Sequence, residues 1–500
     1  MASHTPDGEG AAPRDSHTIT ERTPLLSDSP SASTSASVSE SSTITSTPSF
    51  QSELYLLTSY SLPLITTYLL QYSYSVITTF VAGHLSASAL AAASIGMTAM
   101  NIVGFATIEG MATALDTLCA QAYGSGNLPG VGLHVQRMLL VMALAIVPIA
   151  AIWAFSPWIL SFFVRQPELA VMAGSFLRAS ILGLPGYAGF EAGKRFLQAQ
   201  GAFRPAMLVL LVCTPVNALL SWLLAFRLAM GLEGAALAVA ITNTLRPLLL
   251  LLYIASPWGK WSRCCWGGFS RDALAVRKWG PVIRLSCAGS AVNLGEWFAS
   301  EVLSFSTAYL STRHLAAQSV LTTVSIMSWH IPFSVSVAVS TRIGHLVGAG
   351  LLPTARRAAL LYSVVFTVIG VVDGGVIFAL RDSLPPFFSD DKRVCELAAN
   401  TMLTVAVFQV IDSIINCTNG LLRGLGRQGF AAWVVFAVNY LGAVPLAMWL
   451  ELGSPGWGLQ GVWIGLGCGM VVIAVVEGIY MKMMRWEDCV ESAKEREEGE

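Results

Sequence analysis

Long apolar segments, separated by short polar breaks, follow one another from about residue 54 to residue 484. A helix needs about 20 mainly apolar residues to cross a bilayer, and each segment is long enough to do so. The pattern predicts an all-α integral membrane protein with about twelve transmembrane helices. The expected crossings are 54–80, 88–121, 133–155, 169–192, 205–226, 232–254, 281–309, 315–341, 354–379, 394–422, 429–450 and 457–482.

The longest connection divides these segments into two groups of six. We expect a disordered cytosolic tail, because the first residues are rich in Ser, Thr and Pro and poor in large apolar side chains. An N-terminal six-helix lobe, a cytosolic linker, a C-terminal six-helix lobe and a solvated cytosolic tail of mixed charge follow. The corresponding boundaries are 1–51, 52–254, 255–280, 281–484 and 485–500.

Lys and Arg in the connections set the orientation, because they accumulate on the cytosolic side of membrane proteins. With the N-terminus in the cytosol, fourteen of them lie in cytosolic loops and six in the opposite loops. Both tails add further basic residues to the cytosolic side. We therefore expect an even number of crossings and two cytosolic ends.

Composition excludes several functional classes. Hydrophobic residues make up 54% of the chain and charged residues 12%, with a mean hydropathy of +0.62. Soluble domains carry roughly 25% charged residues, so lipid is the expected solvent for most of this chain. The net charge of −1 and the absence of a long basic patch argue against a nucleic-acid partner. The nine cysteines form no C-x-x-C pair, so we expect no metal site, no disulfide framework and no cofactor.

The two halves of the chain resemble each other. Residues 122–129 (AYGSGNLP) align with 346–353 (LVGAGLLP), at an offset of 224 from Gly124 to Gly348. Three further matches follow at nearly the same offset: 90–94 with 315–319, 196–201 with 421–426, and 231–234 with 458–461. Each repeat holds an even number of crossings, so the halves share one orientation. This predicts two pseudo-symmetric six-helix bundles, with a site between them or inside each one.

Several motifs, taken together, resemble the multidrug and toxic compound extrusion (MATE) family. They occur in the order in which that family has them, and Glu296, Trp297 and Glu301 match the seventh helix of its eukaryotic branch. His345 stands where the family often has Asn, and Gln71 stands where many prokaryotic members have an acid in the first helix. The other matching stretches are 81–85 with 90–94, 110–124, 196–201, 340–350 and 423–428.

The resemblance implies antiport of organic cations, drugs or metabolites against a cation gradient, with protons as the usual counter-ion in eukaryotes. It implies a monomer in the lipid bilayer, a small organic solute and protons as partners, and no catalytic residues. Gln71 in place of an acid puts a first-helix proton or sodium site in doubt.

Acids inside the bilayer call for an explanation, because a charge there costs about 2.5–3.5 kcal/mol on insertion scales. Asp412 lies in the tenth crossing, with Gln409 three residues before it and Asn416 four residues after it, so all three share a helix face. We expect Glu296 and Asp412 to form a proton and substrate site in the C-terminal lobe. Glu301 is the second choice, and the alternative is that these carboxyls only hydrogen-bond neighbouring helices.

The N-terminal lobe offers weaker candidates. Gln71 and Asn101 are expected to line a cavity there, whereas the spacing of Glu191 and Arg195 favours a simple ion pair within one helix. Glu477 lies late in its crossing, where a long side chain reaches the interface at little cost.

The expected N-terminal tail contains Glu21 four residues before the pair Leu25–Leu26. This arrangement resembles a dileucine sorting signal that an adaptor complex could bind. It favours a vacuolar or lysosome-like membrane, with the plasma membrane as the alternative.

Three other functions are alternatives to antiport: a flippase, a membrane enzyme and a passive channel. A flippase for lipid-linked substrates, from a related superfamily, is expected to need a strongly basic cavity, and the intramembrane basic residues are few. A membrane enzyme would need a nucleophile and a base or a His–Asp pair, and His330 has no evident partner in the sequence. A passive channel would need no counter-ion. A proton-coupled exporter that is not an enzyme is the reading that the sequence favours.

Overall fold

The computed structural model describes residues 50–164, 166–307, 309–389 and 391–498. Helices and their connections make up this part of the chain, without strands. The expected sorting signal, with Glu21, Leu25 and Leu26, lies outside the described residues.

The first half forms six crossings, three of which contain irregular turns. The second crossing passes through a π-helical turn, the fourth through a 3-10 turn, and the fifth ends in a π-helical turn. The elements are α1 (Phe50–Leu85), α2 (Ala87–Ala99) with η1 (Met100–Phe105) and α3 (Ala106–Ser125), α4 (Leu128–Ala154), the short α5 (Ser156–Ser161), α6 (Pro167–Ser180) with η2 (Ile181–Gly183) and α7 (Leu184–Gln198), α8 (Arg204–Trp222) with η3 (Leu223–Arg227), and α9 (Gly231–Ala255).

Three 3-10 turns connect this half to the second, which again forms six crossings and then a final helix. The connecting turns are η4 (Pro257–Cys265), η5 (Arg271–Leu274) and η6 (Val276–Lys278). The crossings are α10 (Gly280–Thr307), α11 (Thr312–Gly348), α12 (Leu352–Leu380) followed by the turn η7 (Pro385–Phe387), α13 (Lys392–Gly424), α14 (Gln428–Val438) with η8 (Asn439–Ala443) and α15 (Val444–Leu452), and α16 (Leu459–Met483); the final helix is α17 (Glu487–Glu498).

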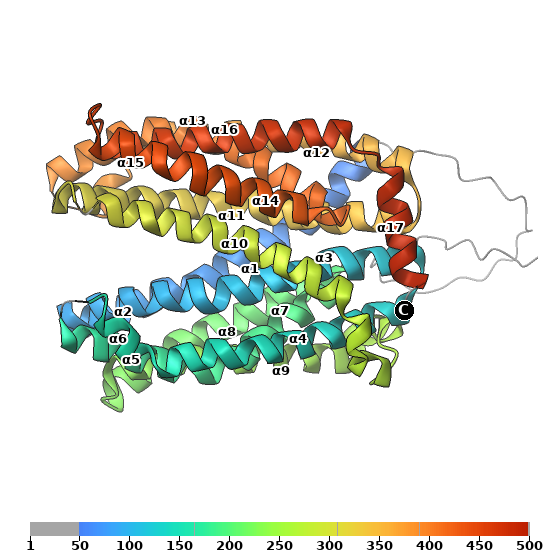
Figure 1. Cartoon of the computed structure of the whole chain (residues 1–500). Coiled ribbons are helices and arrows are strands. Elements are labelled where there is room, and N and C mark those ends of the chain that lie inside the picture. Colours follow the sequence, from blue (N-terminus) through green and yellow to red (C-terminus); the bar gives the residue numbers. More distant parts are fainter. Residues whose placement is uncertain (1–49, 165, 308, 390, 499–500) are drawn as a thin grey trace, which may run out of the picture. The chain divides into compact units, whose positions relative to one another are not determined.

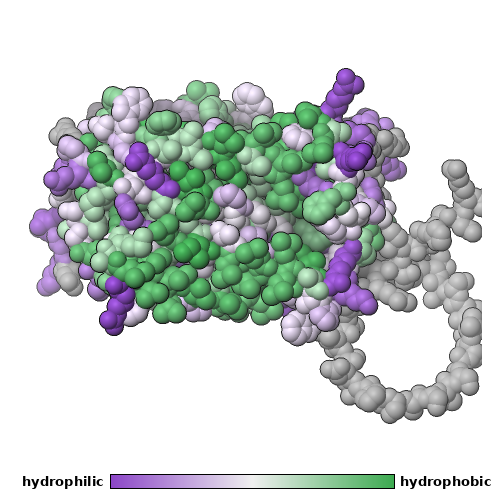
Figure 2. Space-filling model, turned by 90° about the horizontal axis from the view of Figure 1, so that it is seen from below, coloured by the Kyte–Doolittle hydropathy of each residue, from purple (hydrophilic) through white to green (hydrophobic). Residues whose placement is uncertain are grey.

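Apolar surface surrounds this helical body. Ten helical stretches within the described residues are long and apolar enough to cross a membrane. The long helices α1 and α10 are not among the ten; they bring the number of crossings to twelve. Figure 2 shows one face, where apolar side chains form a broad band and hydrophilic residues gather towards its two ends. This is the surface that a bilayer requires.

Matched positions of the repeat have matching backbone geometry. Ser86 and Ser311 both cap the helix that follows, each accepting a hydrogen bond from the backbone N–H three residues later. Matched glycines adopt a positive φ, which costs other residues strain: 88° at Gly126 and 71° at Gly350, 80° at Gly201 and 72° at Gly426, and 57° at Gly231 and 55° at Gly458. The repeat is therefore present in the structure as well as in the sequence.

The two bundles meet through α3, α10 and α11. Figure 1 shows α10 to α16 in one bundle and α2 to α9 in the other, close together near α17 and diverging towards the opposite end. Gly110 and Gly289 let α3 and α10 pack backbone to backbone, because a Cβ on Gly289 would stand 2.2 Å from the carbonyl oxygen of Gly110. The contact holds the two bundles together between α3 and α10.

The C-terminal segment is not a wholly solvated tail, so that expectation is wrong. Trp486, Cys489 and Ala493 are buried against the core that α11 and α12 form. Glu487 pairs with Arg356 at 2.9 Å, which ties the first turn of α17 to α12. An apolar side chain every three to four residues gives this short helix an inner face, despite its high overall charge.

Candidate functional site

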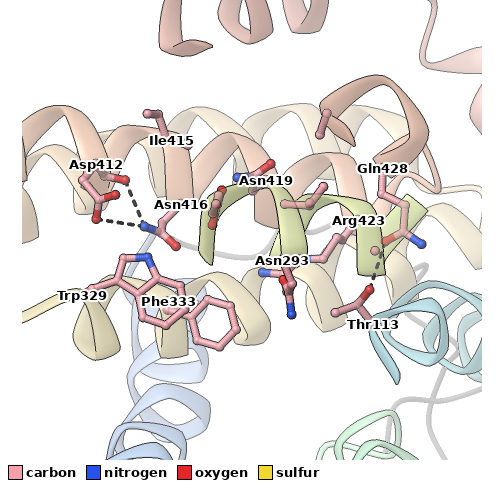
Figure 3. A pocket seen from close by; sticks show the side chains of 14 residues that line it. Thr113, Asn293, Trp329, Phe333, Asp412, Ile415, Asn416, Asn419, Arg423 and Gln428 are labelled. Atoms are coloured by element: carbon pink, nitrogen blue, oxygen red, sulfur yellow. Dashed lines mark hydrogen bonds between the residues drawn. The ribbon is translucent and has the colours of Figure 1, made fainter. Parts of the chain in front are cut away.

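A cavity of about 50 Å³ lies where α10, α11, α13 and α14 meet α3 (Figure 3). Its volume is enough for a few water molecules, since one needs roughly 10–15 Å³ on this measure. Two acids, one guanidinium, several amides and two large aromatic rings surround it. The lining residues are Thr113, Gly289, Val292, Asn293, Glu296, Trp329, Phe333, Asp412, Ile415, Asn416, Asn419, Arg423, Gln428 and Ala431.

Asp412 and Asn416 form the best-defined polar contact at this cavity. Asn416 Nδ2 donates to Asp412 Oδ2 at 3.2 Å and to the Asp412 carbonyl oxygen at 3.0 Å. Asn419 follows three residues later on α13 and lines the same cavity. Asp412, Asn416 and Asn419 thus form a polar stripe along one face of α13, while the other faces of the helix pack against apolar neighbours.

Glu296 reaches the cavity from α10, one turn after Asn293. Asn293 Nδ2 donates to the Ala106 carbonyl oxygen of α3 at 3.4 Å, and the Ser290 hydroxyl donates to that of Thr107 at 3.0 Å. These bonds fix the middle of α10 against the other lobe. The helix thereby places the Glu296 carboxyl beside the same cavity as Asp412.

Aromatic rings form one wall. Trp329 stacks on Phe333 with 4.3 Å between ring centroids, and Tyr68 of α1 meets Phe333 edge-on at 5.1 Å. Figure 3 shows Trp329 and Phe333 beside Asn416, on the opposite side of the cavity from α13. Such ring faces attract organic cations.

Hydrogen bonds and an ion pair join the two lobes beside the cavity. Thr113 Oγ1 of α3 donates to Gln428 Oε1 of α14 at 3.5 Å, and within the C-terminal lobe Gln428 Nε2 donates to the Leu285 carbonyl oxygen at 2.8 Å. The hydroxyl of Thr117 donates to the carbonyl oxygen of Arg423 at 2.6 Å, and Arg423 Nη1 lies 3.8 Å from Asp116 Oδ2.

The N-terminal lobe holds a buried charge cluster that meets Arg423 of the cavity lining at Asp116. Glu191 pairs with Arg195 at 2.6 Å, as its spacing predicts, and with Lys194 at 2.9 Å. Gln71 donates to Glu191 at 3.0 Å and accepts from Lys194 at 3.2 Å. Gln71, which is expected to line a cavity, therefore hydrogen-bonds within an ion-pair network, and Arg195 extends the network to Asp116 at 3.4 Å.

The structure brings together only some of the predicted site residues. Glu296, Asp412 and Asn416 share the cavity, whereas Glu301, half-buried further along α10, is not part of its lining. Gln409 is buried one turn before Asp412, and its Nε2 has no hydrogen-bond partner among the described residues. Asn101 lies half-buried in the π-helical turn η1, away from this lining.

Other lining residues were missed in the sequence. Asn419 could have been found, because it continues the spacing of Asp412 and Asn416 along one face. Thr113, Trp329 and Arg423 come from helices far apart in the chain, and only tertiary packing reveals them. The expectation that Glu477 reaches the interface is wrong: it is fully buried in α16 and accepts a hydrogen bond from Thr418 at 2.5 Å.

Comparison with known proteins identifies the family. The MatE family model matches residues 63–223 and 290–449. An uncharacterized transporter of Schizosaccharomyces pombe is 38% identical over 443 residues, which cover 88% of this chain and 81% of the relative. Protein DETOXIFICATION 16 of Arabidopsis thaliana is 32% identical over 442 residues, covering 87% and 89%. The crystal structure of the eukaryotic MATE transporter AtDTX14 matches with a TM-score of 0.84 at 27% identity, over 89% of this chain and 99% of that one.

These likenesses confirm the resemblance to the eukaryotic branch, and with it the all-α fold of two six-helix bundles. The chain belongs to the MatE family and is a multi-pass membrane transporter, not an enzyme.

Proposed function

We propose that this transporter is a secondary active antiporter that exports organic cations, drugs or metabolites from the cytosol in exchange for protons. The observation that carries the proposal is that Glu296 and Asp412, from different helices, line one cavity with an aromatic wall. Acids inside a membrane protein are costly and commonly mark ion or substrate paths.

Competition between protons and the organic cation for the two carboxyls would couple the transport of one to the transport of the other. A proton and an organic cation both neutralise a carboxylate, so occupation by one disfavours the other. Arg423 is the one guanidinium in the lining and is paired in part with Asp116 across the lobes. Loading or releasing a proton at Glu296 or Asp412 would change the charge that Arg423 faces, and with it the bonds between the lobes.

The small size of the cavity supports a role in binding the proton rather than the whole solute in this conformation. A drug-sized ligand needs a pocket of roughly 300–1,000 Å³, whereas this one measures about 50 Å³. Trp329 and Phe333 would form the nearest wall of a wider solute site when the lobes move apart. Alternating access between two similar lobes is the expected mechanism in such a fold.

The names of relatives favour the same substrate class. A rabbit (Oryctolagus cuniculus) relative, 29% identical over 449 residues, is called multidrug and toxin extrusion protein 1. We further propose residence in a vacuolar or lysosome-like membrane, where an acidic lumen supplies protons. The tail segment with Glu21, Leu25 and Leu26 would bind the adaptor that delivers the protein there.

Proteoliposomes with an imposed pH gradient, acid inside, test the antiport. Uptake of a fluorescent organic cation is followed for the wild type, Glu296→Gln, Asp412→Asn and Glu301→Gln. Glu451→Gln is the matched control, because Glu451 is a buried carboxyl of the same lobe outside the cavity, bonded to Ser306. We expect the first two variants to lose at least about tenfold in gradient-driven uptake and the control to stay within about threefold.

Each other outcome overturns a defined part of the proposal. Retained uptake in Glu296→Gln and Asp412→Asn would remove these residues as the proton site. Uptake driven by a sodium gradient alone would replace the coupling ion. Movement that needs no gradient would indicate a channel. Movement of a lipid-linked substrate in place of the cation would favour the flippase.

A further inference from the structure

We propose that the cytosolic side of the C-terminal lobe carries a binding site for an anionic glycerophospholipid of the cytosolic leaflet. The site is a second, larger hollow of about 1110 Å³, bounded by α10, α14, α16 and α17. It is separate from the cavity around Asp412 and contains neither carboxyl of the proposed proton site. The proposal does not depend on the coupling ion or the transported solute.

Three arginines line the cytosolic end of this hollow. Arg284 comes from the first turns of α10, Arg427 from the turn before α14, and Arg496 from the end of α17. Glu495 is the one acid in the lining, and its side chain is exposed. Three positive charges against one negative charge favour an anionic ligand at the level where lipid head groups lie.

These guanidinium groups are only partly used by the protein. Arg284 is exposed and has no hydrogen-bond or ion-pair partner within the described residues. Arg496 Nε donates to the Ser492 carbonyl oxygen at 2.7 Å, and Nη1 lies 2.9 Å from the place where a Cβ on Gly426 would be. The absence of a side chain at Gly426 leaves room for the guanidinium beside the hollow.

Two neighbouring acids pair with arginines outside the hollow, although Asp488 also acts on the charge of Arg427, whose side chain hydrogen-bonds Cys489. Glu487 binds Arg356 at 2.9 Å, and Asp488 lies 3.8 Å from Arg485. Neither of these acids lines the hollow. Its cationic end is therefore open to a phosphate group, whose oxygens match the donor geometry of arginine.

The rest of the wall is apolar and extends into the membrane. Ala288 and Ala291 of α10 face Trp433 and Phe436 of α14 across the hollow, and Phe430 stacks on Tyr480 at 3.7 Å. From Gly429 to Phe436 the helix rises roughly 10 Å. Small residues on one side and rings on the other suit an acyl chain that descends from a head group at the arginines. A free phosphate ion would leave this wall unused.

A bound lipid would hold α10 and α14 together beside the cavity around Asp412. Leu285, in the wall of the hollow, also accepts the hydrogen bond from Gln428, a lining residue of that cavity. A molecule that spans α10, α14 and α17 holds these elements together in the present conformation. Release of the lipid would ease their separation.

Lipid binding to the full-length protein in detergent tests the site directly. Fluorescently labelled phosphatidic acid and phosphatidylcholine, with identical chains, are titrated by anisotropy at fixed salt. The groove variant combines Arg284→Gln, Arg427→Gln and Arg496→Gln. The charge-matched control combines Lys260→Gln, Arg271→Gln and Arg277→Gln, three exposed residues of the cytosolic linker.

We expect the wild type to bind phosphatidic acid at least about tenfold more tightly than phosphatidylcholine, and the groove variant to lose that preference. The control should bind within about twofold of the wild type. Equal losses in both triple variants would show a diffuse basic surface and overturn the site. Unchanged binding in the groove variant would overturn it as well.

A second variant with an uncharged substitution tests the site independently, in case the triple variant loses lipid binding because it misfolds. Ala288→Trp fills the apolar wall and leaves all three arginines in place. Phosphatidic acid should then bind to Ala288→Trp at least about tenfold more weakly than to the wild type. Inorganic phosphate should displace the labelled lipid only weakly from either protein. If inorganic phosphate competes as well as the lipid, or if Ala288→Trp binds the lipid normally, the ligand is a soluble phosphate and the lipid proposal fails.

Discussion

Gly348 of α11 lies directly against Gln121 of α3: a Cβ added to the glycine would stand 2.1 Å from the Gln121 carbonyl oxygen. The same contact recurs with the partners exchanged, because a Cβ on Gly124 would stand 2.2 Å from the carbonyl oxygen of His345. Gly124 and Gly348 are matched positions of the repeat, as are Gln121 and His345. The pseudo-symmetry axis therefore passes between α3 and α11 where the lobes touch.

Adding a methyl group at this contact should open the cytosolic gate. Overpacking a tight contact costs about 1–3 kcal/mol, which disfavours the closed conformation roughly 5- to 150-fold. We expect Gly348→Ala to reduce gradient-driven uptake at least about tenfold. The check is uptake in proteoliposomes together with labelling of a cysteine placed on the cytosolic half of α3, which should become more reactive.

Gly375→Ala is the matched control, because Gly375 lies in a membrane helix with no atom within 4 Å of an added Cβ. It should transport normally. If Gly348→Ala transports as well as this control and its cysteine stays protected, the glycine contact does not form the gate.

A second contact joins the lobes through charge. Arg342 Nη2 of α11 lies 2.5 Å from Glu53 Oε1 of α1, and the Tyr362 hydroxyl donates to Glu53 Oε2 at 3.1 Å. A double-mutant cycle with Glu53→Gln and Arg342→Gln should give a coupling of about 0.5–3 kcal/mol in the free energy of unfolding. Denaturant unfolding in detergent, followed by fluorescence, measures it.

The exposed pair of Arg356 and Glu487 serves as the comparison, since solvent screens such pairs. Its cycle should show less coupling than that of Glu53 and Arg342. Equal couplings in the two cycles would mean that burial adds nothing to the contact between the lobes.

The stability of the protein should depend strongly on the charge of Glu191, which lies in the buried cluster of the N-terminal lobe. Glu191→Ala leaves Lys194 and Arg195 buried without their shared carboxylate, and breaking a buried ion pair costs about 3–5 kcal/mol. We expect a markedly lower thermal midpoint in detergent. Adding Lys194→Met should restore part of the loss, since one unpaired charge disappears. A double variant less stable than Glu191→Ala would contradict this account.

The sequence predicts the helices better than their contacts. Apolar length marks each crossing, and the spacing of Asp412 and Asn416 along one face predicts a polar stripe that the structure places on a cavity. Gln71 and Glu477 show the limit. Each has the features of a residue that faces water, yet Gln71 hydrogen-bonds Lys194 and the fully buried Glu477 accepts a hydrogen bond from Thr418, both partners coming from other helices. The short helix α17 was missed because three apolar residues among many charges give a weak signal.

The thermal stability of the protein at low pH tests the cap of α13, which lies outside the membrane. A hydrogen bond from the backbone N–H of Arg393 to Asp391, at 2.9 Å, and the nearby Arg313 lower the pKa of this carboxyl. The stabilisation is therefore present above the ordinary pKa of about 4 and is lost as pH falls through the lowered value. Thermal midpoints of the wild type and Asp391→Asn should differ at pH 5 and converge in more acidic buffer. A constant difference over the whole range would show that ionisation of Asp391 contributes nothing to the cap.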